Sequence, residues 1–136
     1  MKQSSSANSL LMSRTAILRA AFWAAAAFAL VMASVPHPPQ VPGAPSDKVQ
    51  HIAAFLTLGL LAAAAYRNTP LIRIGFGLSL FGALIELVQA IPALHRDSDP
   101  LDWIADSAAA ALILIVIGLL RERRGERRGK QIGEPG

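Results

Sequence analysis

The chain has 136 residues, of which 53% are hydrophobic and 16% are charged, and its formal net charge at pH 7 is +4. It is too short and too apolar for an ordinary multi-domain soluble protein. It contains no cysteine, which excludes a disulfide framework, a thiolate metal site and a cysteine nucleophile. Because the apolar residues come in long runs, the composition indicates a small integral membrane protein.

Four apolar runs are long enough to cross a bilayer, which takes about 17 to 25 residues per helix. They cover residues 16–35, 49–66, 71–91 and 101–120. None alternates in the manner of a barrel strand, and a helix satisfies its backbone polar groups within the segment. We therefore expect an all-α fold, a four-helix transmembrane bundle over residues 16–120. The polar segments 1–15 and 121–136 are expected to be tails with little order beyond a turn or two.

Prolines and small polar residues mark the breaks between these helices. Residues 35–47 hold five of the nine prolines, which predicts an extended connection after the first helix. A tight turn is expected at residues 68–70, and Pro92 ends the third run. Pro100 is suited to the first position of the last helix. The N-cap of that helix is then expected among the three preceding residues, Asp97, Ser98 and Asp99.

The basic residues are distributed very unevenly across the predicted membrane. Eleven of the thirteen fall on the side that holds both termini, and only Lys48 and Arg96 fall on the other. The positive-inside rule therefore predicts cytoplasmic termini, with loops 36–48 and 92–100 facing outward. The basic tail RERRGERRGK is interpreted as an anchor on the anionic cytoplasmic leaflet rather than as a nucleic-acid site.

The first apolar run has a second interpretation, a cleaved signal peptide. Basic residues precede it, and Val31-Met32-Ala33 is an acceptable cleavage pattern. The apolar run and its polar lead are both long for a signal peptide, so we expect a retained helix.

Polar residues enter three of the four runs at one depth, near the predicted outer surface. Their spacings of three or four residues place them on a single face of each helix. A charge at the bilayer centre costs on the order of 2.5 to 3.5 kcal/mol, so we expect the three helices to converge on a shared, hydrated pocket. The candidate residues, with Arg96 from the outer loop, are Asp47, Lys48, His51, Glu86, Gln89, Arg96, Asp102 and Asp106.

Small residues favour close packing of the third and fourth helices beneath this pocket. Gly75, Ser79 and Ala83 recur every four residues on the third helix, and Ala105 and Ala109 do so on the fourth. Such stripes are typical of contacts between transmembrane helices.

Three segments resemble the VanZ-like family of bacterial membrane proteins. They are DKVQHIAAFLTLGLL, GALIELVQAI and RDSDPLDWIADSAAA, in family order between Asp47 and Leu120. The resemblance implies a helical membrane protein and places the family's polar positions on the eight candidate residues. The founding member is tied to resistance to the glycopeptide teicoplanin, and no settled biochemical activity carries over. The chain departs from the family at Ala109 and Ile113, where glycines are common, and at Asp106, where asparagine is usual.

Three functions of the polar cluster are compatible with the sequence. The first is purely structural: Arg96 would pair with Glu86 or Asp102, Lys48 would pair with Asp47 or Asp106, and Gln89 would bridge the rest. The second is an outward-facing pocket that binds an envelope precursor or another amphiphile, and cationic or hydrogen-bonding groups suit its acidic surroundings better than phosphates.

The third is an intramembrane hydrolase acting on an envelope lipid. His51 with Glu86, Asp102 and Asp106 would hold a divalent metal, or Glu86 and His51 would form an acid–base pair. No further cofactor is expected. The binding pocket is the function we favour, and the sequence leaves the ligand and the oligomeric state open.

Overall fold

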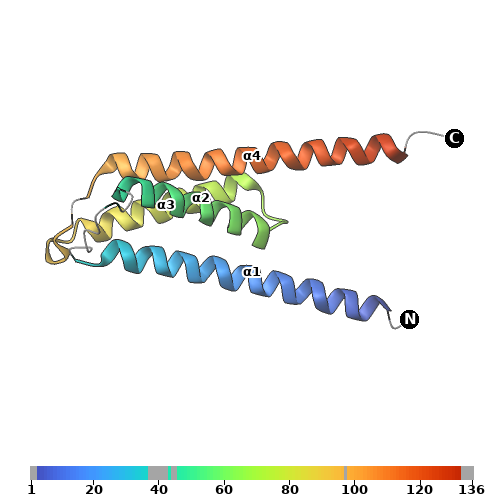
Figure 1. Ribbon diagram of the computed structural model, residues 1–136, viewed down its shortest axis with the longest axis horizontal. Helices are drawn as coiled ribbons and strands as arrows, with labels where there is room; N and C mark the ends of the chain where they lie inside the picture. The colour runs from blue at the N-terminus through green and yellow to red at the C-terminus, as the bar shows by residue number, and fades with distance from the viewer. Residues whose placement is uncertain (1–2, 37–42, 44–45, 97, 133–136) are drawn as a thin grey trace.

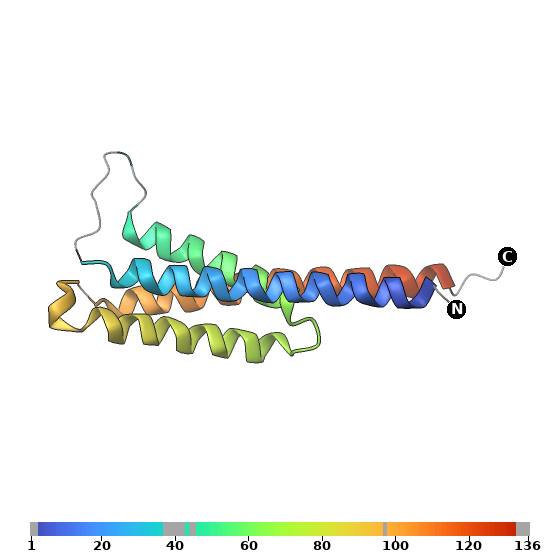
Figure 2. The ribbon, with the colours of Figure 1, turned by 90° about the horizontal axis from the view of Figure 1, so that it is seen from below.

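The protein is a bundle of four helices in the computed structural model, which describes residues 3–36, 43, 46–96 and 98–132. The helices are α1 (Gln3–Ser34), α2 (Asp47–Ala65), α3 (Leu71–Gln89) and α4 (Pro100–Ile132), with a short 3₁₀ turn, η1 (Pro92–Leu94). They run roughly along one axis, and the start of α1 and the end of α4 lie at the same end (Figures 1 and 2). The predicted all-α, four-helix architecture is confirmed.

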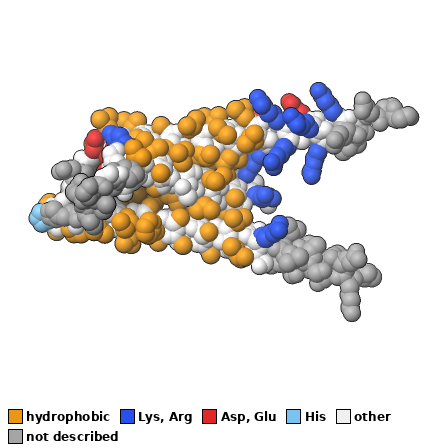
Figure 3. Space-filling model, in the orientation of Figure 1, with side chains coloured by type: hydrophobic (Ala, Val, Ile, Leu, Met, Phe, Trp, Pro, Cys, Tyr) orange, Lys and Arg blue, Asp and Glu red, His pale blue; other side chains and the backbone are white. Residues whose placement is uncertain are grey.

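Each helix contains a segment long and apolar enough to cross a membrane. Large apolar side chains also face outward, such as Ile72, Phe76 and Leu87, which are 81%, 67% and 70% exposed. Figure 3 shows hydrophobic side chains as a continuous apolar band on one face of the molecule, with basic side chains gathered beyond one of its edges. An apolar surface of this extent is unusual for a soluble monomer and is what a lipid environment requires.

The two polar segments expected to be poorly ordered tails are helical over most of their described residues, which corrects the prediction. α1 begins at Gln3 rather than near residue 16, and α4 continues to Ile132 rather than ending near residue 120. Residues 3–15 contain neither glycine nor proline, so nothing interrupts the helix there. Residues 121–130 are mainly arginine, glutamate and lysine, which are strong helix formers, and Glu122 precedes Glu126 and its basic neighbours at helical spacing.

Local capping sets the start of the helices that carry the candidate residues. Ser46 is the N-cap of α2, and its hydroxyl accepts a hydrogen bond from the Val49 amide at 3.4 Å. Asp99 caps α4, because its carboxylate accepts from the Leu101 amide at 2.9 Å and Pro100 is the first helical residue. Of the three N-cap candidates, Asp99 therefore fills the role, while Asp97 lies outside the described residues.

α2 is the central helix, because it packs against α1, α3 and α4. Its side chains Phe55 and Leu58 are almost fully buried, together with Ile85 of α3 and Ala110 of α4. These residues form the centre of the core, between the charged ends of the bundle.

Glycines allow the close helix contacts. A Cβ atom at Gly59 of α2 would lie 2.5 Å from Cγ2 of Ile113, so the Ile113 side chain occupies the space above this glycine. On α3, a Cβ atom at Gly75 would lie 3.4 Å from Leu114, and the hydroxyls of Ser79 and Ser107 are hydrogen-bonded at 2.9 Å. The predicted small-residue contact between the third and fourth helices is confirmed. The isoleucine at position 113 is accommodated by the glycine on the facing helix.

Gly59→Leu is expected to destabilise the bundle by about 1 to 3 kcal/mol, because the new side chain and Ile113 would compete for one space. Thermal unfolding in detergent measures the change. Gly77→Leu is the matched control, since a Cβ atom there meets nothing within 4 Å. Equal losses in the two variants would contradict the importance of the α2–α4 contact.

Candidate functional site

The candidate residues lie at the end of the bundle opposite the basic cluster. Asp47, Lys48 and His51 begin α2, and Asp102 and Asp106 begin α4. Glu86 and Gln89 end α3, and Arg96 lies in the loop between α3 and α4. The structure joins them in pairs rather than around one central cavity.

His51 and Asp106 form the deepest pair. The His51 Nδ1 atom is 3.2 Å from Oδ2 of Asp106, and their side chains are 9% and 0% exposed. An ionised carboxylate is an acceptor only, so Asp106 orients the Nδ1–H of the imidazole toward itself. The other ring nitrogen, Nε2, then points away from α4. The pair therefore links α2 to α4 and fixes the orientation of the histidine ring.

Two further ion pairs surround this one. Lys48 Nζ lies 3.1 Å from Oδ1 of Asp102, and Arg96 Nη2 donates to Oδ2 of Asp47 at 3.1 Å. Both pairings differ from the predicted ones, in which Arg96 met Glu86 or Asp102 and Lys48 met Asp47 or Asp106. Adjacent residues on a helix do not face each other, so Lys48 turns toward α4 while Asp47 turns toward the loop.

Glu86 holds the start of α4 against the end of α3. Its Oε2 atom accepts hydrogen bonds from the Ser98 hydroxyl at 3.0 Å and from the Asp99 amide at 2.9 Å. A carboxylate at a helix N-terminus also interacts favourably with the helix dipole. These bonds explain why Arg96 finds its partner elsewhere, and they make Ser98 a site residue that the sequence analysis did not identify.

Gln89 contacts α1 rather than bridging the ion pairs, which corrects the prediction. Its side-chain amide donates to the backbone carbonyl of Ala33 at 3.4 Å. Ala33 belongs to the last turn of α1, where carbonyl groups have no partner within the helix. Gln89 therefore ties the end of α1 to α3.

Two buried carboxylate oxygens, Glu86 Oε1 and Asp106 Oδ1, have no hydrogen-bond partner among the described residues. The carboxylate of Asp102 has the Lys48 ammonium group within ion-pair distance. Because buried polar groups are nearly always hydrogen-bonded, these two oxygens are places where an additional donor would be stabilised.

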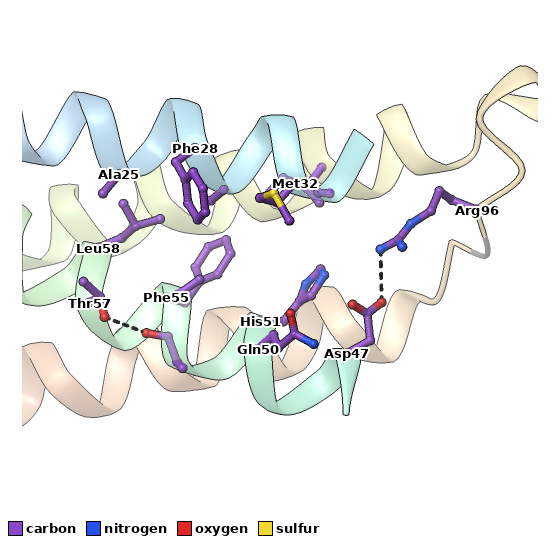
Figure 4. Close-up of a pocket in the computed structure, with 15 residues that line it drawn as sticks. Ala25, Phe28, Met32, Asp47, Gln50, His51, Phe55, Thr57, Leu58 and Arg96 are labelled. Carbon is purple, nitrogen blue, oxygen red and sulfur yellow. Dashed lines mark hydrogen bonds and ion pairs between the residues drawn. The ribbon is translucent and has the colours of Figure 1, made fainter. Parts of the chain in front are cut away.

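A groove of about 410 Å³ lies between α1 and α2 and reaches the charged end. Figure 4 shows Phe28 and Met32 of α1 facing Phe55 and Leu58 of α2 along its length. At its mouth lie four polar side chains, those of Asp47, Gln50, His51 and Arg96. The sequence analysis predicted three of these four but missed Gln50 and the whole contribution of α1. The sequence does not distinguish the α1 residues that line the groove, because they are apolar like the rest of this membrane helix.

The four residues suggested as metal ligands are not gathered around one point. Glu86 bonds Ser98 and Asp99, Asp102 pairs with Lys48, and only His51 and Asp106 meet. Within the described part of the chain, no three histidine or acidic side chains are placed to hold a metal ion together. The direct contacts are ion pairs and hydrogen bonds between protein groups.

Comparison with protein-family models, curated proteins and solved structures gives no match to this chain. The VanZ-like resemblance therefore stays a prediction carried by three sequence segments. In the structure these segments, although separated along the chain, meet at one end of the bundle through the Lys48–Asp102, His51–Asp106 and Glu86–Asp99 contacts.

Asp106→Ala is expected to lower the free energy of unfolding by about 3 kcal/mol, because it leaves a buried histidine without its partner. Glu126→Ala removes an equal charge from an exposed position of α4, and its expected cost is below about 1 kcal/mol. Thermal or denaturant unfolding in detergent compares the two. An effect at Asp106 no larger than that at Glu126 would show that the buried pair does not hold α2 and α4 together.

Proposed function

We propose that the chain is a small VanZ-like protein of the bacterial inner membrane that binds an amphiphilic, envelope-related ligand in the groove between α1 and α2. The observation that carries this proposal is the combination, in one groove, of apolar walls and a mouth of charged and hydrogen-bonding side chains. A structural salt-bridge network alone would not require an open groove beside it.

The walls suit an alkyl or isoprenoid chain. The groove has about 410 Å³, which is within the common range for small-molecule sites of about 300 to 1,000 Å³. Alanines, such as Ala25 and Ala29, keep its α1 side shallow, while Phe28 and Phe55 supply broad apolar surfaces. A lipid chain would gain contacts there without displacing any ion pair.

The mouth suits an uncharged or cationic hydrogen-bonding headgroup. Arg96 is already paired with Asp47, and Lys48 is paired with Asp102, so neither cation is free for a phosphate. A sugar or an amine therefore matches the mouth better than an anionic group.

The His51–Asp106 geometry supports a second candidate, an intramembrane hydrolase of an envelope lipid. A buried carboxylate that orients a histidine ring, where that histidine also lines a cavity, is an arrangement suited to a general base. Binding is preferred because no nucleophile is placed beside His51 by the described contacts. The family resemblance alone adds a role in glycopeptide (teicoplanin) resistance to the proposal.

Groove binding is tested with a photoactivatable alkyl glycoside as the probe, cross-linked to the detergent-purified protein and mapped by peptide mass spectrometry. Labelling is expected on α1 and α2 residues of the groove. Ala29→Phe fills the groove and is expected to reduce labelling by roughly tenfold, corresponding to an overpacking cost of about 1 to 3 kcal/mol.

Ala27→Phe is the matched control, because Ala27 lies on the same helix, is exposed and does not line the groove. Equal labelling of both variants, or label spread evenly around the bundle, would argue against a binding groove. Release of the sugar from an unmodified envelope glycolipid by the parent but not by His51→Gln would favour the hydrolase instead.

The proposed orientation predicts opposite accessibility of the two ends. The chain has no cysteine, so single cysteines can be introduced at Ala93 in η1 and at Gly125 in α4. In spheroplasts of a bacterial host, a membrane-impermeant maleimide is expected to label Ala93→Cys directly and Gly125→Cys only after permeabilisation. The reverse pattern would overturn the assignment of cytoplasmic termini.

A further inference from the structure

A second hollow lies between α2 and α4 at the basic end of the bundle, opposite the groove. It has about 500 Å³. Its floor is apolar and its rim carries three arginines. The lining residues are Leu60, Ala63, Ala64, Arg67, Ile117, Leu120, Arg121 and Arg124.

The arginines are arranged around this hollow by the two helices. Arg121 donates through Nη2 to the backbone carbonyl of Ala63 at 2.8 Å, which occupies a carbonyl in the last turn of α2. Arg124 follows three residues later on the same side of α4, and Arg67 lies directly after the end of α2. One of the three guanidinium groups is therefore held in place by the backbone.

These positive charges are not neutralised by the lining. No acidic residue borders the hollow. Within the described part of the chain, none of the three arginines forms an ion pair within 4 Å, in contrast to Lys48 and Arg96 at the other end. Guanidinium groups with free N–H donors bind phosphate in a bidentate manner.

The hollow lies where the apolar part of the bundle meets its basic end. Leu60, Ile117 and Leu120 belong to the apolar runs of α2 and α4, and the arginines follow where the sequence of those runs turns polar, at residues 67 and 121. Figure 3 shows basic side chains at this edge of the apolar band. A ligand here would meet apolar side chains at acyl-chain depth and guanidinium groups at headgroup depth.

We propose that this hollow is a binding site for one anionic phospholipid of the cytoplasmic leaflet. Its phosphate lies among Arg67, Arg121 and Arg124, and an acyl chain lies against Leu60 and Ile117. Basic pockets between transmembrane helices on the cytoplasmic side are suited to such headgroups. This site shares no residue with the groove between α1 and α2 and does not depend on ligand binding there. Its assignment to the cytoplasmic leaflet rests on the proposed orientation.

The test measures retention of phosphatidylglycerol and phosphatidylcholine, supplied in equal amounts, by native mass spectrometry of the full chain in detergent. The parent is expected to retain one phosphatidylglycerol in preference to phosphatidylcholine. Arg67→Gln with Arg124→Gln is expected to weaken that retention by roughly tenfold or more. Arg67→Lys with Arg124→Lys keeps the charge but loses the bidentate donors, and it is expected to retain phosphatidylglycerol better than the glutamine pair and less well than the parent.

The control is Arg127→Gln with Arg128→Gln, which removes the same charge from exposed positions farther along α4 that do not line the hollow. Circular dichroism establishes that each variant is folded; Arg67 and Arg124 are exposed, so neither substitution removes a core contact. Retention of phosphatidylglycerol by this control at the parent level supports a defined site.

Equal losses in the site and control pairs would show a diffuse attraction of the basic tail and overturn the site. Equal retention of both lipids by the parent would do the same. A competition experiment distinguishes a phospholipid headgroup from free inorganic phosphate. It compares phosphatidylglycerol retention in sodium phosphate with retention in sodium chloride at matched ionic strength. Binding of inorganic phosphate to the hollow without any preference for the lipid would overturn the assignment to a phospholipid.

Discussion

The fully buried carboxylate of Asp106 is the constraint on which the arrangement of the helices depends. A buried carboxylate requires a partner, and here the partner is His51 at 3.2 Å from the facing helix. The pair sets how α2 and α4 are rotated toward each other at one end. Farther down, the Ile113 side chain over Gly59 sets how closely they approach. α3 completes this arrangement because Gly82 leaves room for Phe55, Trp103 and Asp106 to meet above it.

The two ends of the bundle use charge in opposite ways. At the acidic end, Lys48 and Arg96 are each bound to an aspartate, and Glu86 is bound to the loop that starts α4. At the basic end, Arg121 caps α2 through a carbonyl, and the arginines around the hollow keep their charge uncompensated. The first pattern fixes helices and leaves little charge for an ionic ligand. The second attracts anions, which the cytoplasmic leaflet would supply in the proposed orientation.

α1 contributes differently from the other three helices. It holds none of the candidate polar residues, and it contacts α3 near its end through the Gln89–Ala33 hydrogen bond. Its face toward α2 carries Ala25, Ala29 and Ala33 beside Phe28 and Met32, which leaves the groove rather than a closed core. The groove therefore exists because small side chains of α1 do not fill the space beside the central helix. If the first helix were removed, the groove would lose one wall while the ion pairs of α2, α3 and α4 would remain.

The sequence by itself determined the number of helices, the sites where they break and the end at which the polar residues gather. Hydropathy, the prolines and the cap at Asp99 are local properties, and helical spacing keeps residues such as Asp102 and Asp106 on one face. α1 and α4 are longer than their apolar runs because polar, helix-forming residues continue each helix beyond the part that suits a membrane.

The tertiary structure alone decided which charges pair and where the cavities lie. Several pairings of Lys48, Arg96 and the acidic residues satisfy the same spacing, and the choice among them depends on the rotation of each helix about its axis and on the path of the loop at Ser98. The groove and the arginine-lined hollow also arise from distances between helices. Such distances are set by the packing of side chains from different segments, which no single segment of sequence encodes.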